Sequence, residues 1–425
     1  MPSRQSIYCV ASAGALFALS ACASVSLKEA SPAPAPVPTA APAPPPPAWA
    51  QGRSDSMADS QLAPHAPVLT VTAHEKIAID RIRVPPGFKV EVWASGAPGA
   101  RMMTRADNGT VFAGTRAIGR VYAITETSGR REVKVFASGL TQPNGVAFKN
   151  GSLYVAAINQ VFRYDNVEKL LDAYSSKSAH PVDMTPAFNL PTYQHHGWKF
   201  LAVGPDNKLY IPIGAPCNIC EPPATNAQIR RYNLDGTGME VVALGVRNSV
   251  GFDFHPQTGE LWFTDNGRDW AGDEGPQDEL NRVSKARENF GFPYCHALGI
   301  GDQDIKKANP CEGVTLPVVL MGPHVAALGM RFYTGDMFPP EYKNNIFVAR
   351  HGSWNRTRKS GYDVVFVSVS PDGRNAQVTP FMTGFLDTST NTFWGRPADV
   401  MQMPDGSMLV SDEQNGAIYR VSYSQ

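Results

Sequence analysis

The chain has 425 residues, with 38 Lys plus Arg against 38 Asp plus Glu, so its formal charge is zero. A nucleic-acid partner would need a basic excess, and the balanced charge argues against one. Hydrophobic residues make up 43% of the chain, which is enough for a buried core. Plentiful aromatic residues and glycines, with few long helix-forming runs, favour an all-β protein.

The first residues are typical of an export signal, because Arg4 is followed by an apolar or small stretch over residues 7–19. Leu19-Ser20-Ala21-Cys22 then resembles a bacterial lipobox. The sequence therefore predicts a signal peptide over residues 1–21, lipidation of Cys22 and anchoring on the periplasmic side of the envelope. Ala23 favours the outer membrane. An ordinary signal or an uncleaved anchor stays open, although a spanning helix needs about 20 apolar residues.

Residues Ser31 to Trp49 are nearly all Pro and Ala. Such a tract cannot bury apolar surface and tends to an extended polyproline-type spacer. We expect little order before about Val71, a lipidated N-terminus and linker over 22–70, and one folded domain over 71–425.

Six cysteines are present, of which Cys9 lies in the signal and Cys22 takes the lipid. The other four are Cys217, Cys220, Cys295 and Cys311. In an oxidising compartment four cysteines suggest two disulfides, and proximity favours pairing within 217–220 and within 295–311. A metal or haem site is the alternative for the first pair. Glu221, not His, follows it, and no second C-x-x-C exists.

A turn rich in Asn, Asp or Gly, followed by a short apolar strand, recurs six times. The turns are Asn108-Gly109, Asn150-Gly151, Asp206-Asn207, Thr258-Gly259, Asn344-Asn345 and Asp405-Gly406. Their spacings are 42, 56, 52, 86 and 61 residues. A period of about 40–60 residues with four strands is typical of propeller blades. We therefore predict a six-bladed β-propeller of four-stranded antiparallel blades, with an insertion over roughly 269–323. A β-sandwich and a β-helix fit the length and period less well.

Several polar clusters lie close to the repeated strands. His195 and His196 precede the third strand and could bind metal, act as a base or cap a loop. Arg247-Asn248 offers donors to a carboxylate- or carbonyl-rich ligand, or is an ordinary turn. The run from Thr264 to Glu279 is rich in oxygen ligands suited to calcium, or is a solvated acidic loop.

Two further clusters, residues 351–356 and 394–397, flank the fifth and sixth repeats. Polar or cationic groups from several blades therefore converge, as a cofactor site on a propeller axis requires. The arginines among them predict an anionic ligand.

The order of these motifs resembles the superfamily of sugar dehydrogenases that depend on pyrroloquinoline quinone (PQQ), closest to its sorbosone-dehydrogenase-like branch. The resemblance runs from residue 84 to the C-terminus. The matching runs are residues 84–92 (Val84-Pro85-Pro86-Gly87-Phe88-Lys89-Val90-Glu91-Val92), 204–210 (Gly204-Pro205-Asp206-Asn207-Lys208-Leu209-Tyr210), 216–221 (Pro216-Cys217-Asn218-Ile219-Cys220-Glu221), 262–270 (Trp262-Phe263-Thr264-Asp265-Asn266-Gly267-Arg268-Asp269-Trp270), 278–281 (Asp278-Glu279-Leu280-Asn281), 290–296 (Phe290-Gly291-Phe292-Pro293-Tyr294-Cys295-His296) and 351–356 (His351-Gly352-Ser353-Trp354-Asn355-Arg356).

The resemblance implies a role for particular residues. His196 would be the catalytic base. The residues expected to contact PQQ are His195, Arg247, Asn248, Arg396 and Gln142. Calcium would be held by the backbone carbonyls of Gly267 and Arg268 and by the cofactor. A cationic residue of the fifth blade would be Arg350 or Arg356. The sequence departs from relatives at Lys199, where they often have Arg, and Gln142 is only an approximate counterpart of their glutamine.

The resemblance thus implies oxidation of an aldose or sorbosone-like sugar aldehyde or alcohol by hydride transfer to PQQ. Electrons would then leave to a separate acceptor, a cytochrome or a quinone. Two alternatives remain. One is a metal-dependent lactonase, which needs Glu, Asn and Asp ligands on the axis. The other is a non-catalytic lipoprotein propeller that binds an envelope partner.

Overall fold

The computed structural model describes residues 47–54 and 57–424. The predicted signal, Cys22 and most of the Pro/Ala tract lie outside the described residues. Within the described part of the chain, no helix is long and apolar enough to cross a membrane. Cys217 pairs with Cys220 and Cys295 with Cys311, so both predicted disulfides are confirmed.

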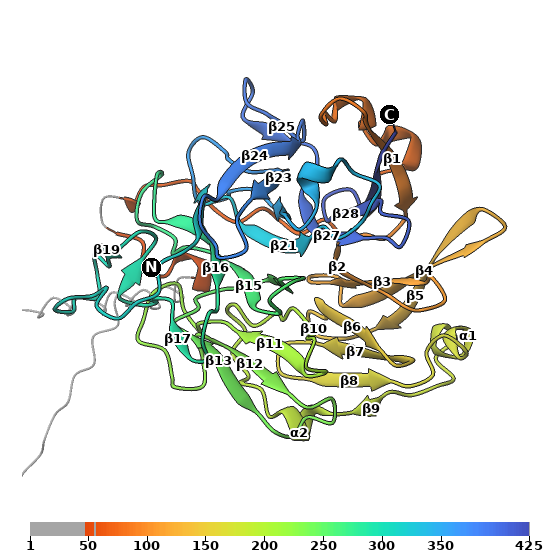
Figure 1. Ribbon diagram of the computed structural model, residues 1–425, viewed down its shortest axis with the longest axis horizontal. Helices are drawn as coiled ribbons and strands as arrows, with labels where there is room; N and C mark the ends of the chain where they lie inside the picture. The colour runs from red at the N-terminus through yellow and green to blue at the C-terminus, as the bar shows by residue number, and fades with distance from the viewer. Residues whose placement is uncertain (1–46, 55–56, 425) are drawn as a thin grey trace, which may run out of the picture. The chain divides into compact units, whose positions relative to one another are not determined.

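The first three blades are antiparallel sheets that follow one another in chain order (Figure 1). The first contains β2 (Ala100–Arg105), β3 (Val111–Thr115), β4 (Arg120–Thr127) and β5 (Arg130–Ser138). The second contains β6 (Gly145–Lys149), β7 (Ser152–Ala156), β8 (Val161–Tyr164) and β9 (Val182–Asp183), with short helices α1 (Leu171–Ser175) and α2 (Thr185–Phe188) beside them. The third contains β10 (Ala202–Val203), β11 (Leu209–Ile213), β12 (Gln228–Tyr232) and β13 (Glu240–Leu244), and β17 (Glu288–Asn289) adds to it in parallel.

Three more sheets complete the ring, and the predicted six-bladed propeller is confirmed. The fourth contains β14 (Gly251–Phe254), β15 (Leu261–Asp265), β16 (Gln277–Arg282) and β20 (Val319–Pro323). The fifth contains β21 (Ala327–Phe332), β22 (Ile346–Arg350), β23 (Asp363–Ser368) and β24 (Gln377–Met382). The sixth contains β27 (Pro397–Gln402), β28 (Met408–Asp412), β29 (Ala417–Tyr423) and β1 (Phe88–Ser95).

Small elements decorate this frame. They are the hairpins β18 (Cys295–His296) with β19 (Ile300–Gly301) and β25 (Leu386–Asp387) with β26 (Thr392–Phe393), and the 3₁₀ turns Ala48–Ala50, His74–Lys76, Ile79–Arg81 and Pro340–Tyr342.

The second strand of most blades is buried along its whole length, as in β3, β11, β15 and β28. Neighbouring blades cover both of its faces, so these strands are continuously apolar rather than alternating. The core accordingly lies between blades: Trp262 of β15 packs in one cluster with Met330 and Val348 of the fifth blade. This burial explains why the repeated strands were visible in the sequence to within a residue or two.

The predicted insertion over 269–323 is too long. Strands β16 and β20 of the fourth blade lie inside that interval, and the excursion between them covers only residues 283–318. The sequence Gln277–Arg282 was interpreted as part of an acidic loop. It forms strand β16, whose pairing with β20 shifts register between Asp278 and Glu279, and both of these side chains are buried and accept backbone N–H groups, as described below.

The sixth blade is closed by both ends of the folded chain. Strand β1 pairs antiparallel with β29, in a register that runs from Phe88 opposite Tyr423 to Ser95 opposite Ala417. The first strand of the propeller is therefore the outermost strand of its last blade.

Residues 47–54 and 57–70, which precede Val71, include groups that contact the propeller. Thr72 donates its N–H to the carbonyl of Asn415, and Trp270 donates its indole N–H to the carbonyl of Trp49 at 2.9 Å. We call residues 47–54 and 57–68 the strap.

Candidate active site

A cavity of about 560 Å³ is lined by residues of all six blades. Representative residues are Arg101 in β2, Gln142 before β6, His196 before β10, Arg247 before β14, Leu328 in β21 and Arg396 before β27. First strands of neighbouring blades contact one another, for example β2 with β6 and β21 with β27. The cavity therefore lies where these strands converge, and its volume suits a small organic molecule.

The structure brings most of the predicted site residues to this one cavity. They are His195, His196, Arg247, Asn248, Gln142, Arg396 and Gly267. Arg268 is not among the residues that line it. The guanidinium of Arg268 is buried in ion pairs with Asp302 at 2.8 Å and Asp304 at 2.7 Å.

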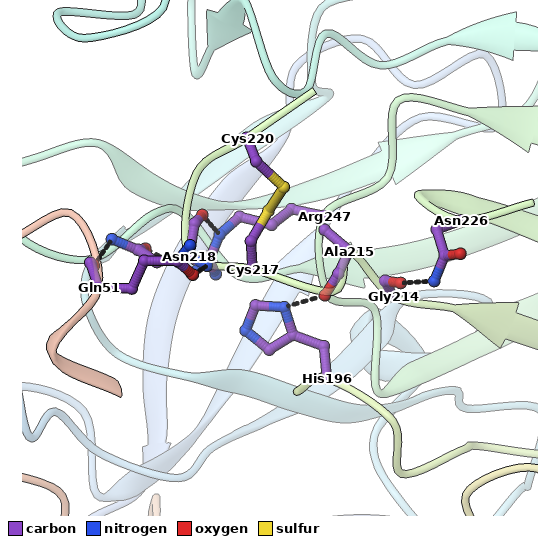
Figure 2. The surroundings of a disulfide bond; sticks show 9 residues. All are labelled: Gln51, His196, Gly214, Ala215, Cys217, Asn218, Cys220, Asn226 and Arg247. Atoms are coloured by element: carbon purple, nitrogen blue, oxygen red, sulfur yellow. Dashed lines mark hydrogen bonds between the residues drawn. A yellow bond between two sulfur atoms is a disulfide. The ribbon is translucent and has the colours of Figure 1, made fainter. Parts of the chain in front are cut away.

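His196 is a neutral imidazole in a defined tautomer. Its Nδ1 lies 3.0 Å from the carbonyl oxygen of Ala215 (Figure 2). A carbonyl only accepts, so Nδ1 carries the proton and Nε2 keeps its lone pair. Burial, and then the charge of Arg247, lower the pKa of His196 well below its usual range. The ring is therefore an unprotonated base at neutral pH.

The backbone around His196 is tightly constrained. Its φ of 48° is in the left-handed region, which a residue with a side chain adopts only when its surroundings enforce it. Gly214, after β11, lies against it: a Cβ there would be 2.6 Å from both the Cβ and the carbonyl oxygen of His196. Behind the loop, buried Lys199 donates from Nζ to the carbonyl of Gly197.

His195 places a second imidazole beside the first, with the two ring centroids 4.0 Å apart. Burial, followed by Arg247 and Arg116, lowers the pKa of His195 to about 4. Its Nε2 is buried and has no hydrogen-bond partner within the described part of the chain. Such an atom costs free energy unless a ligand satisfies it.

Arg247 and Asn248 are fixed from behind by one carboxylate. Asp265, the last residue of β15, accepts the backbone N–H of Arg247 at 2.8 Å and that of Asn248 at 2.6 Å. Burial raises the pKa of Asp265 to about 7. The guanidinium of Arg247 donates from Nε and Nη2 to the carbonyl and side-chain oxygens of Asn218, at 2.9 and 2.8 Å (Figure 2). Asn218 lies between the two cysteines of the first disulfide.

The backbone of Arg396, on the sixth blade, is also held by a buried aspartate. Its N–H donates to Asp412, the last residue of β28, at 2.8 Å. Its guanidinium donates only to carbonyls in the described structure, those of His351 at 3.3 Å and Gly352 at 3.1 Å. Arg396 forms no ion pair with a carboxylate of residues 47–54 or 57–424. A cation held by neutral oxygens beside a cavity can bind an anion.

Three charged residues of the cavity were not predicted from the sequence: Arg101, Arg116 and Glu413. Glu413 accepts from Arg101 and from His351, both at 2.6 Å. Burial alone would raise the pKa of Glu413, but Arg101 and His351 hold it well below its usual range. Glu413 is thus an anion whose charge is already balanced.

Arg116 is the least satisfied of these cations. Its guanidinium carbon lies 3.7 Å from the ring centroid of Trp198, and its Nε donates weakly to Gln142 at 3.4 Å. It has no ion pair within the described chain, and burial followed by Arg101 lowers its pKa to about 10. Arg116 therefore stays charged at neutral pH and faces the cavity without a balancing carboxylate.

A positional signal could have found Arg116 and Glu413. In four blades the residues directly after the second strand line the cavity. They are Arg116 after β3, Asn266 and Gly267 after β15, His351 and Gly352 after β22, and Glu413 and Gln414 after β28. The second strands were predicted correctly, so the residue after each was available.

Neither cation proposed for the fifth blade lines the cavity. Arg350 donates from Nε to Asp363 at 2.7 Å, and Arg356 pairs with Glu274 at 2.5 Å. His351 contributes to the cavity from that blade instead. Burial, and then Arg396, lower the pKa of His351 to about 3.

The predicted acidic loop is largely a buried structural feature. Asp278 accepts the N–H of Gly267 at 2.9 Å and that of Ala327 at 3.1 Å. Glu279 accepts the N–H of Ala297 at 2.7 Å, and burial raises its pKa to about 8. Among the described residues, no three His, Cys, Asp or Glu side chains gather as metal ligands. The carbonyl of Gly267 accepts from Nη1 of Arg247 at 2.8 Å.

The fold and the site together define a propeller whose cavity suits a small polyanionic molecule. A family model described as TrAA12-like matches residues 82–424. An uncharacterized protein of Borreliella burgdorferi is 35% identical over 364 residues, which are 84% of this chain and 94% of that protein. A PQQ-dependent sugar dehydrogenase of Hypocrea jecorina is 23% identical over 77% of this chain and 81% of that protein.

Solved structures agree on the fold. The calcium structure of a Trichoderma reesei carbohydrate-active enzyme of family AA12 has a TM-score of 0.67 at 19% identity, covering 83% of this chain and 100% of that one. The holo form of the PQQ domain of Coprinopsis cinerea pyranose dehydrogenase has a TM-score of 0.63 at 19% identity, covering 80% and 97%. The chain belongs to the TrAA12-like family, and its resemblance to the PQQ-dependent sugar dehydrogenase superfamily is confirmed.

Proposed function

We propose that the protein is a PQQ-dependent dehydrogenase that oxidises an aldose or a sorbosone-like sugar at a hydroxyl or aldehyde group. The observation that carries this proposal is His196, a neutral base of fixed tautomer in a cavity that also presents unbalanced arginines. Two relatives named as PQQ-dependent sugar and pyranose dehydrogenases support it.

The residues present fit PQQ, a planar tricarboxylate. The cavity contains two arginines without carboxylate partners among the described residues, Arg116 and Arg396, and the orphaned Nε2 of His195. Arg247, which also lines the cavity and pairs with Asp269 at 3.2 Å, adds a third cation. Carboxylates bind guanidinium groups through strong charge-assisted hydrogen bonds. We therefore assign cofactor binding to Arg116, Arg247 and Arg396, with His195, Gln142 and Asn248 as polar partners.

The calcium ligands implied by the resemblance fit this arrangement less well. The Gly267 carbonyl already accepts a guanidinium N–H, and a divalent cation there would be repelled by Arg247. Arg268 is not among the residues lining the cavity. We therefore derive no step through calcium.

Bound PQQ would supply a quinone carbonyl that accepts a hydride from the sugar. The chain's own residues would remove the proton. Nε2 of His196 takes the proton of the substrate hydroxyl, so that the sugar loses one hydride and one proton in total. Ala215 stabilises the imidazolium that results, because its carbonyl accepts from Nδ1. Arg247 and His195 disfavour a charged ring, which lets His196 release the proton after turnover.

The first experiment is a titration of the full-length protein with PQQ in calcium-containing buffer, followed by absorbance. Dye reduction over a panel of aldoses, including sorbosone, then measures turnover. Binding together with turnover is the expected result. A protein that binds no PQQ and reduces no dye would overturn the proposal and leave a non-catalytic propeller.

Replacing His196 by Ala tests the base. We expect kcat to fall by about 10²–10⁴, the usual contribution of a general base, with PQQ affinity changed less than threefold. Stopped-flow dye reduction and the absorbance titration measure the two effects separately. His180→Ala is the control, since His180 is not among the residues lining the cavity. Turnover that survives in the His196 variant would show that another group takes the proton.

The remaining proposals concern location and partners. We propose a lipid on Cys22, a periplasmic position on the outer membrane and an external electron acceptor, a cytochrome or a quinone. The support is the lipobox-like run 19–22 in the sequence. Cell fractionation of Cys22→Ser against the parent tests the anchor: release into the soluble fraction is expected, and retention in the membrane would contradict it.

A further inference from the structure

The strap covers part of the cavity that the propeller alone would leave open. From the strap segment 47–54, Ala48 and Trp49 line the cavity, and from the segment 57–68, residues 64–68 line it. The six blades supply the charged groups, whereas the strap supplies mainly apolar surface. The strap thus adds apolar surface to a cavity whose charged groups come from the blades.

Trp49 is the largest strap residue at the cavity and is held in place by aromatic contacts. Its ring centroid lies 6.4 Å from that of Trp270 and 6.0 Å from that of Trp354. Trp270 is 1% exposed and donates its indole N–H to the Trp49 carbonyl. Trp49 and Trp354 are only partly buried, and both line the cavity. Two indole rings are thus presented to the space beside the cationic groups.

The strap is tied to the residue that orients Arg247. Asn218 donates from its side chain to the carbonyl of Gln51 at 2.8 Å, and its N–H donates to the side-chain oxygen of Gln51 at 3.2 Å (Figure 2). Gly52 follows with φ of 75°, and a Cβ there would lie 2.8 Å from Asn218. Arg53 then places its guanidinium 4.5 Å from the Trp270 ring. These contacts fix the position of Trp49 relative to the proposed cofactor site.

Resting on the proposed function, we propose that Trp49, together with Trp354, forms the wall of the sugar subsite and sets substrate specificity. A pyranose ring has one face made of C–H groups, which packs on an indole face, while its hydroxyls need polar partners. The cavity contains both indoles together with His196 and the arginines. The substrate class is a small sugar with an unsubstituted ring face. A long polymer would collide with the strap.

The test uses full-length Trp49→Ala and Trp49→Phe. Three quantities are measured: PQQ affinity by absorbance, KM and kcat for glucose and galactose, and the calorimetric affinity of their methyl glycosides. Methyl glycosides cannot be oxidised at C1, so they report binding alone, and they are titrated with and without PQQ. Leu69→Ala, an exposed position just beyond the strap, is the control.

For Trp49→Ala we expect KM and the methyl glycoside Kd to rise about threefold to tenfold, with kcat and PQQ affinity changed less than twofold. Trp49→Phe should recover most of the loss. Unchanged KM and Kd would overturn the subsite, and so would an equal loss of PQQ affinity, which would assign Trp49 to the cofactor. A parent protein that binds methyl glycosides but not PQQ would refute the proposed function and keep the subsite.

Discussion

Asn218 is one residue that holds several parts of the site together. Its two oxygens accept from Arg247, its side-chain oxygen also accepts the N–H of Asp269 at 2.7 Å, and its amide nitrogen donates to Gln51. It is fully buried, so no water replaces these partners without rearrangement. The disulfide between Cys217 and Cys220 closes a short loop around it.

Asn218→Ala should therefore weaken PQQ binding about tenfold and loosen the strap, because a buried guanidinium loses one charge-assisted acceptor. The absorbance titration measures the first effect, and proteolysis within residues 47–68 measures the second. Asn233→Ala, in an exposed turn, should leave both unchanged. Equal PQQ affinity in parent and variant would show that Arg247 does not depend on this residue.

Site residues could be predicted where they belong to a sequence motif. Residues that reach the site only through the three-dimensional fold could not. His196, Arg247 and Arg396 each sit just before a first strand, and the sequence identified them. Arg101 lies inside the apolar strand β2, at an irregularity in its pairing with β3, and nothing local distinguishes it. The strap was missed because its contacts involve residues more than 160 positions away.

At the scale of elements, the end of β11 positions His196, the proposed base. Gly214 directly follows this strand and allows His196 to approach it, and Ala215 then supplies the carbonyl that fixes the tautomer. Any side chain at position 214 would push the His196 loop away from the strand. The placement of the proposed base thus depends on a residue with no functional group.

Gly214→Ala should lower kcat at least tenfold, because small displacements of a catalytic group are costly, while the propeller stays folded. Dye-reduction kinetics and circular dichroism measure the two properties. The control is Gly275→Ala, where an added Cβ meets nothing within 4 Å. Normal kcat in the Gly214→Ala variant would show that the loop relaxes without losing the base.

The elements themselves were largely predictable, because Asn-Gly and Asp-Gly turns precede strands that are buried on both faces. The exception is β16, whose sequence is polar. Asp278 and Glu279 are 2% and 8% exposed, and their side-chain oxygens accept backbone N–H groups from other segments. A carboxylate that completes a backbone hydrogen-bond network cannot be distinguished in sequence from one that faces water.

At the scale of the whole molecule, the pairing of β1 with β29 holds the ring closed. Val421 is fully buried and lies opposite both Val90 and Met408, so it joins the N-terminal strand to the rest of the sixth blade. A charge at this position would lie in the apolar cluster that contains Val421. Burying a charge there would therefore separate the strands of the sixth blade, and the effect would not be confined to a loop.

Val421→Asp should reduce the free energy of unfolding by several kcal/mol. PQQ binding and β-structure should be lost in the same thermal transition, since the cavity needs all six blades. Circular dichroism and the absorbance titration, followed over temperature, compare the two. Ser424→Asp, at the exposed end of the chain, should melt like the parent. Separate transitions would mean that the ring survives without its closure.

The same pairing sets an order of events while the chain is being made. Roughly 330 residues separate β1 from β29, so at about 5–20 residues per second the first strand waits roughly 20–70 s for its partner. During that time it is an open edge that other chains could join. Lys89 and Glu91, both exposed on β1, place charges along this edge. Charges on a strand edge disfavour pairing with other chains, both while the chain is incomplete and in the finished sheet, where β1 remains the edge strand.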